Sequence, residues 1–370
     1  MGNKVPQKLP EMSSQKVYSD SAYKGEMEDD VPHGQGKMTF SDGSVYKGEF
    51  KNGDRHGKGV QCFKNGHVFN GYFENDVPVS GTYVNKKHTI YEGEFIKGFI
   101  LEGKDCIINH SNGNKYIGDV FNDKPHGKGT MNYKTGDQYV GEFKEGFRHG
   151  YGTFTRKSGE VYKGQFEKDI PTVGTYINTK GVIWKGTFIG DYYLQGEDCT
   201  ITTSDYTYTG GVSKDKKDGK GVTIWKNGNT YVGEYKNDLR YGKGIMTWAN
   251  ENVYDGEWKD GVIQGQGTFT WANGNVYKGT FSDGKRNGFG ITTWAELETK
   301  GSEYVEVRFE GTWKDNKMHE GILRKRTPQH TFIDFSIPGH VPIQDGTRIA
   351  ALEDKVKVLT EMVEKLQDLP

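Results

Sequence analysis

The sequence has little of what a layered hydrophobic core or a membrane anchor requires. Apolar residues make up only 33% of its 370 residues, and no apolar stretch suits a signal peptide or a membrane span. Lys and Arg number 49 against 50 Asp and Glu, so the balanced charge gives no overall attraction to nucleic acid or to an anionic membrane. We expect an intracellular, cytoplasmic protein that does not bind nucleic acid.

Cysteine is scarce as well, since Cys62, Cys106 and Cys199 are the only three. In the repeat pattern described below they fall two and four repeats apart, which is roughly 20 and 40 Å at the spacing of β-strands. These separations are far beyond the reach of a disulfide. Free thiols in a reducing compartment are therefore expected.

Glycine and aromatic residues are what the chain has in excess, with 53 glycines and 13% aromatics. An aromatic residue opens the pattern aromatic-x-Gly-[usually acidic or polar]-[usually aromatic] thirteen times, at steps of 23, 23, 22, 25, 23, 23, 22, 24, 23, 23, 23 and 32 residues. A fixed period of this size indicates an array of stacked supersecondary units. The openers are Tyr23, Tyr46, Phe69, Tyr91, Tyr116, Tyr139, Tyr162, Trp184, Tyr208, Tyr231, Tyr254, Tyr277 and Phe309.

Each unit has the pattern of two short strands joined by a turn. Alternate residues of a strand share a face, so Tyr139, Gly141 and Phe143 point one way and Val140 the other. The second segment, as in Gly242-Lys-Gly-Ile-Met-Thr-Trp248, alternates in the same way. One face is therefore aromatic and glycine, and the other is mostly charged and hydroxylic. Each glycine is expected to leave a flat site on which a cross-strand ring can lie.

This pattern resembles the MORN repeat, the membrane occupation and recognition nexus family, over residues 23–324. The resemblance implies an elongated single-layer antiparallel sheet of successive hairpins, in agreement with the alternation. We predict an all-β array of about 13 hairpins within 21–324, a flexible arm over 1–20 and a linker over 325–346. The aromatics chosen to mark the repeat face are Tyr46, Phe50, Tyr139, Phe143, Tyr231, Trp248, Tyr254, Trp258, Trp271 and Tyr277.

Irregular repeats occur in corresponding pairs. Repeats three and seven are each one residue short and lose the Gly-x-Gly, while repeats four and eight are longer and have Asp105 or Asp198 in place of the second glycine. Residues 23–115 and 116–207 therefore look like one duplicated four-repeat module, followed by a third block, 208–324. The irregularities are either inherited without a role, or they form bulges that set the curvature or a docking point.

Residues 347–370 carry the pattern of an amphipathic helix. Six apolar residues at steps of 3, 4, 3, 4 and 3 place β-branched residues at each a position and leucine at each d position of three heptads, which favours a parallel two-stranded coiled coil. We predict a homodimer through this helix. Because three heptads are marginal alone, the alternative is docking on the aromatic face of the array or on another protein. The six residues are Ile349, Leu352, Val356, Leu359, Val363 and Leu366.

The sequence lacks motifs for catalysis, cofactors or metals. The recurrent Gly-Lys-Gly has no Walker spacing and no helix signal after it, and kinase signatures are missing. His33, His56, His126 and His149 share one position of the repeat, but one repeat is about 10 Å of sheet, too far for a shared ion. We expect a protein that is not an enzyme, with no cofactor and no metal.

The resemblance implies recognition or scaffolding, because MORN arrays occur in cytoskeletal and ciliary scaffolds, radial-spoke heads and junctional membrane proteins, and beside phosphoinositide kinases. We predict a scaffold that binds other proteins in a cytoskeletal, ciliary or axonemal assembly. The alternative is a peripheral membrane adaptor that binds phosphoinositides or recruits a lipid kinase. Acidic residues offset the basic row that such an adaptor would need, so lipid binding is not favoured. The basic row is Lys24, Lys47, Lys163, Lys185 and Lys278, and the acidic residues are Glu26, Glu49, Glu94, Glu142, Glu234 and Glu257.

Overall fold

The structure, a computed structural model, describes residues 14–18, 21–96, 98–190, 192–295, 306–326 and 331–337. Across these residues the regular secondary structure consists of thirty β-strands and no helix. The chain divides into two compact units, Met1–Lys180 with Phe188–Tyr192, and Gly181–Thr187 with Tyr193–Pro370. The division lies inside the second module that the sequence suggested, 116–207.

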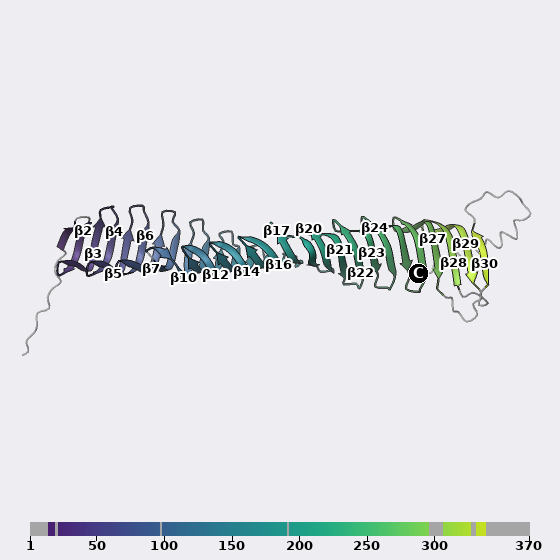
Figure 1. Cartoon of the computed structure of the whole chain (residues 1–370), viewed down its shortest axis with the longest axis horizontal. Helices are drawn as coiled ribbons and strands as arrows, with labels where there is room; N and C mark the ends of the chain where they lie inside the picture. Colours follow the sequence, from purple (N-terminus) through teal and green to yellow (C-terminus); the bar gives the residue numbers. More distant parts are fainter. Residues whose placement is uncertain are drawn as a thin grey trace, which may run out of the picture. The chain divides into compact units, whose positions relative to one another are not determined.

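In the first unit each strand pairs antiparallel with the next along the chain (Figure 1), except that β8 pairs with β7 and β10 near its start and with β9 at its end. The strands are β1 (Ser14–Tyr18), β2 (Ser21–Glu28), β3 (Val31–Phe40), β4 (Val45–Lys51), β5 (Asp54–Cys62), β6 (Val68–Glu74), β7 (Val77–Val84), β8 (Ile90–Ile96), β9 (Ile100–Leu101), β10 (Gly103–Asn109), β11 (Lys115–Phe121), β12 (Lys124–Asn132), β13 (Gln138–Lys144), β14 (Phe147–Thr155), β15 (Val161–Glu167) and β16 (Ile170–Ile177).

The second unit is built in the same way. Residues 183–187 of β17 (Ile183–Ile189) belong to this unit, and β17 pairs with β19 through residues 183–185. From β19 onward every strand pairs with its successor. The remaining strands are β18 (Tyr193–Leu194), β19 (Gly196–Thr202), β20 (Tyr206–Ser213), β21 (Lys216–Trp225), β22 (Thr230–Lys236), β23 (Leu239–Thr247), β24 (Val253–Lys259), β25 (Val262–Thr270), β26 (Val276–Ser282), β27 (Lys285–Trp294), β28 (Glu306–Lys314), β29 (Lys317–Arg326) and β30 (Phe332–Ile337).

Within a hairpin the two strands are joined by a tight turn of two residues. Lys236 pairs with Leu239, so Asn237 and Asp238 form the loop, and their φ angles of 49° and 72° are both positive. Positive φ at both central residues is the type I′ conformation, which matches the twist of the flanking strands. Asn and Asp tolerate this conformation better than other residues with a Cβ, so the sequence selects hairpins here.

The predicted seating of aromatic rings on glycine is confirmed. Pairing aligns the central glycines of successive strands, as in Gly233↔Gly244↔Gly256. A Cβ added at Gly244 would lie 2.2 Å from Oη of Tyr231 on the neighbouring strand. The rings therefore occupy the volume that any larger side chain at these positions would need.

The core of each unit contains runs of rings in a zigzag. In the first unit the ring centroids of Tyr23 and Phe50, Phe50 and Tyr46, and Tyr46 and Phe73 are each 5.1 Å apart, with the ring planes nearly perpendicular. This edge-to-face contact is a favourable aromatic geometry. Tyr46 is fully buried and its hydroxyl donates to the carbonyl of Glu49 at 3.0 Å, so the polar end of the ring is satisfied.

Arginine side chains cover part of the aromatic face. The guanidinium carbon of Arg148 lies 4.9 Å from the ring centroid of Phe154 and 5.1 Å from that of Phe166. Its Nε donates to Asp169 at 3.0 Å, and Arg240 and Arg286 lie on Trp258 and Trp313 in the second unit. In a cation–π contact the apolar stem of the arginine lies over the ring. These stems therefore shield part of the aromatic face, which has no second layer of secondary structure over it.

Register shifts occur in the regular repeats as well as in the irregular ones, so they do not decide between the two interpretations of the irregular repeats. The residue that replaces the glycine differs from the prediction. Cys106 pairs with Gly118, and its Sγ lies next to Gly93, so Cys106 stands in the glycine row; the register shifts between Gly103 and Cys106. Asp105 is the extra residue, with φ of 55°. The second unit repeats this with Cys199 in the row and a shift between Gly196 and Cys199.

Aromatic residues from the turns complete the core at the irregular repeats. The ring of Phe99 lies 4.8 Å from Phe63 and 5.2 Å from Phe69, and Tyr192 lies 5.3 Å from Tyr162. Phe99 and Tyr192 occupy corresponding positions of the two predicted modules. Sequence reasoning missed both rings because they stand outside the repeat pattern.

The ends of the array differ from the predicted boundaries. Residues 14–18 of the expected arm form β1, which pairs with the outer edge of β2. β29 continues to Arg326, and β30 pairs with it although the segment 325–346 was expected to be a linker. A strand without the Tyr-x-Gly pattern still forms there because it satisfies the edge of β29. The predicted helix with Ile349, Leu352, Val356, Leu359, Val363 and Leu366 lies outside the described residues.

Candidate functional site

The surface available for binding is the face opposite the opener tyrosines, which we call the open face. Openers such as Tyr139 and Tyr231 have no exposed area, so the aromatic face is occupied by its own rings. Of the aromatics chosen from sequence, Trp248 directly follows β23 and Trp271 directly follows β25, and both are half-buried. The others are buried. These aromatic residues pack in the core and stabilise the fold, and they do not form the exposed surface that a ligand would meet.

Carboxylates at the fourth position of the repeat pattern have a structural role on the open face. Glu142 accepts a hydrogen bond from the backbone N–H of Tyr151 at 3.1 Å, and Glu234 accepts one from the backbone N–H of Lys243 at 3.2 Å. Both carboxylates also lie against the glycine that begins the bulge, Gly150 or Gly242. The acidic residues therefore satisfy backbone donors that the bulge leaves unpaired.

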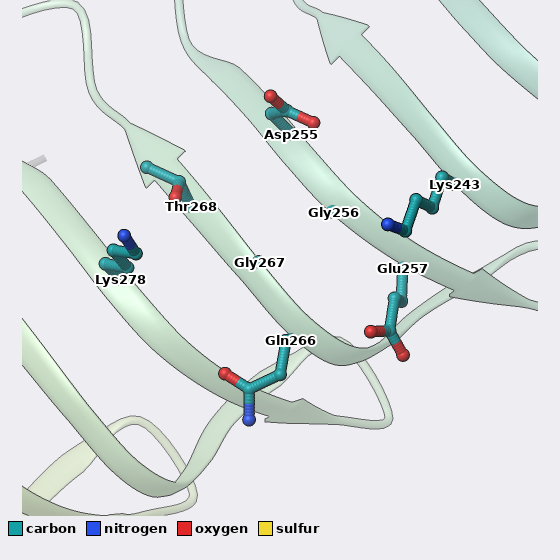
Figure 2. Close-up of a pocket in the computed structure, with 8 residues that line it drawn as sticks. All are labelled: Lys243, Asp255, Gly256, Glu257, Gln266, Gly267, Thr268 and Lys278. Atoms are coloured by element: carbon teal, nitrogen blue, oxygen red, sulfur yellow. The ribbon is translucent and has the colours of Figure 1, made fainter.

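A shallow hollow of about 260 Å³ lies on the open face of the second unit (Figure 2). Lys243 is opposite Glu257 on the next strand, and Asp255, Thr268 and Lys278 form a cross-strand row. Both signs of charge alternate within it. Such a hollow suits polar or charged side chains of a protein partner better than a ligand of one charge.

The open face is more apolar than the sequence analysis predicted. In the first unit Ile117, Val140 and Tyr151 line a hollow together with Asp119 and Lys128. Val140 and Tyr151 are 47% and 48% exposed. Exposed apolar side chains with charged neighbours are typical of protein–protein contact surfaces.

The first three strands of the sheet after β1 place lysines directly opposite one another. Lys24 pairs with Lys37, and Lys37 pairs with Lys47. Lys24 and Lys47 belong to the basic row predicted from the sequence, but Lys37 does not, because it lies on the second strand of its repeat. Lys163, Lys185 and Lys278, the other predicted members of the basic row, face threonine or isoleucine where their partners are described.

The described part of the chain has no group of three or more His, Cys, Asp or Glu side chains arranged to hold a metal ion. No helix in that part is long and apolar enough to span a bilayer. Cys62, Cys106 and Cys199 are unpaired, and burial raises the pKa of Cys106 and of Cys199.

The model of the MORN repeat matches residues 23–45, 46–68, 116–138, 139–161, 208–230, 231–253, 254–276, 277–296 and 309–320. These segments together cover more than half of the chain, and each begins at an opener. The chain belongs to the MORN-repeat family. The stretches 69–115 and 162–207 are not matched, and they contain the irregular repeats three and four and repeats seven and eight. MORN-repeat proteins are generally interaction or scaffold modules.

No curated protein matches the chain. Among solved structures, a similarity is found to the TCP domain of SAS-4 (dCPAP) of Drosophila melanogaster in complex with a proline-rich motif of Ana2 (dSTIL). That similarity has 8% identity and a TM-score of 0.13, and covers 70% of this chain and 99% of the other. A TM-score this low carries no weight for the fold or the function.

Proposed function

We propose that this MORN-repeat protein is a non-catalytic scaffold that presents its open face to protein partners in a cytoskeletal or ciliary assembly. The observation that carries the proposal is the mosaic of exposed apolar and charged residues around Val140 and Tyr151. The opposite face is filled by its own rings. An array with one closed and one open face is suited to holding partners at fixed spacing.

The test is to isolate the full-length chain with its partners from its native cells after chemical cross-linking. Cross-links from partner proteins should concentrate on open-face lysines such as Lys128 and Lys243, and the chain should localise with cytoskeletal structures. Association with lipid alone, or cross-links confined to the two edges of the sheet, would contradict the proposal.

We further propose that the 347–370 segment joins two copies of the chain. Removal of residues 343–370 should turn a dimer into a monomer and leave the array folded, because six apolar side chains would leave the interface. Val356→Asp should do the same by placing a charge in the seam. Light scattering at micromolar concentration decides between this and docking elsewhere, which an intact monomeric protein would indicate.

A further inference from the structure

The lysine row of β2, β3 and β4 is an arrangement that the fold itself disfavours. Lys24, Lys37 and Lys47 are consecutive cross-strand partners, and all three are exposed on the open face. Like charges directly opposite on neighbouring strands are destabilising. Within the described residues none of the three forms an ion pair with a carboxylate.

The equivalent positions later in the chain show that the sheet does not need lysine there. Counting from the openers Tyr116 and Tyr208, the same three register positions hold Ile117, Thr130 and Val140, and then Thr209, Val222 and Val232. The neighbouring glycines pair in the same register each time. The lysines are therefore a local feature of the first repeats rather than a requirement of the fold.

We propose that the row formed by Lys24, Lys37 and Lys47 binds an acidic, extended segment of a partner protein. This rests on the scaffold function proposed above and names the chemistry of one partner. Three adjacent strands span about 10 Å, and an extended peptide advances about 3.3 Å per residue. Roughly four residues of such a segment would cover the row, and its alternate side chains, carboxylates or phosphorylated residues, would face the ammonium groups.

The surroundings of the row favour a segment over a membrane surface. The carboxylates of Glu26 and Glu49 lie on the same face, against Gly34 and Gly57, where Glu49 also accepts from the N–H of Lys58. A flat anionic bilayer would meet these carboxylates together with the lysines, whereas a narrow segment can follow the lysine row alone. Screening within about 8 Å at 0.15 M salt further weakens any long-range attraction to a bilayer.

The test uses the full chain and a fluorescent oligoglutamate peptide, with an oligoglutamine peptide as the reference. Oligoglutamate should bind saturably, and the variant K24I/K37T/K47V should bind it roughly tenfold more weakly. This variant carries the residues that the chain itself uses at 117, 130 and 140, so it should fold. Its unfolding midpoint in denaturant should be no lower than that of the unchanged protein. The charge-matched control K163T/K185T/K278T should bind like the unchanged protein.

Equal affinity of the row variant and the control variant would overturn the assignment. Phosphoinositide vesicles should not co-sediment with the chain at about 0.15 M salt. If the unchanged chain binds vesicles but not the peptide, and the row variant does not bind vesicles, the ligand of the row is a lipid surface and not a protein segment. If the peptide fails to bind while partner cross-links still lie on the open face, the lysine row loses its role and the scaffold function stands.

Discussion

Replacing Gly244 by valine should destabilise the second unit by about 3 kcal/mol, the upper part of the range for overpacking a tight site. The first added carbon alone would lie 2.2 Å from Oη and 2.5 Å from Cζ of Tyr231. The pairing with Gly233 and Gly256 fixes the strand on both sides, so the ring has to leave its place. Urea unfolding followed by circular dichroism measures the loss.

Lys144→Ala is the control for this prediction, because Lys144 is exposed at the end of β13. Its effect should stay within about 0.5 kcal/mol. Since a repeat array can melt locally, the valine variant can also show an early transition confined to the neighbouring repeats. Equal stability of the two variants would show that the aromatic rings do not depend on the space that glycine leaves.

The array should unfold cooperatively as the pH rises from about 10 to 12. Burial raises the pKa of Tyr46, Tyr162, Tyr235 and Tyr277 to about 12, whereas a tyrosine of the unfolded chain ionises near pH 10. Above pH 10 the unfolded state therefore binds fewer protons than the folded state, and stability falls with pH. Below pH 10 the stabilisation is fully present. Circular dichroism should report the unfolding, and ionisation of the buried tyrosines should appear in the tyrosinate absorbance over the same range.

Tyr46→Phe separates this effect from general alkaline damage. Phe69 and Phe309 occupy the same opener position, so the ring is expected to fit, but the hydrogen bond to the Glu49 carbonyl is lost at a cost of about 1 kcal/mol near neutral pH. Because the variant lacks one raised pKa, its deficit should shrink above pH 10. A deficit that does not change with pH would contradict the role of buried tyrosine ionisation.

The features of the fold that follow from the two-residue alternation of a β-strand were predictable from the sequence. Tyr139, Gly141 and Phe143 alternate with Val140 at the period of a strand, and the structure buries the two rings while it leaves Val140 exposed. Glycine between aromatic residues also predicted the ring seats. Each of these inferences uses residues a few positions apart on one strand or one hairpin, where geometry follows directly from the sequence.

Features that depend on how neighbouring repeats stack were not predictable. Asn229 accepts from the N–H of Ala249, and Asp238 accepts from that of Lys217, at separations of 20 and 21 residues. These bonds tie successive loops together, yet Asn and Asp at such positions look like ordinary turn residues. Lys37 was missed for the same reason, since only the register places it between Lys24 and Lys47.

The two faces of the sheet have different roles in this account: the aromatic face stabilises the fold, and the open face binds partners. Substitutions of the glycines beneath the rings should lower the stability of the fold. Substitutions at Lys24, Val140 or Tyr151 should weaken partner binding and leave stability unchanged, because these side chains are exposed. The two classes of variant can therefore be separated by measuring unfolding and partner binding on the same samples.

Tyrosine nitration of the native full-length protein, mapped by mass spectrometry, tests the two-face account most directly. Tyr72, Tyr151 and Tyr241 are 55%, 48% and 40% exposed on the open face, and they should react quickly. Tyr46, Tyr139 and Tyr231 have no exposed area and should react only under denaturing conditions. Equal reactivity of the two sets in the folded protein would contradict the account, because the aromatic face would then be open to solvent and to partners.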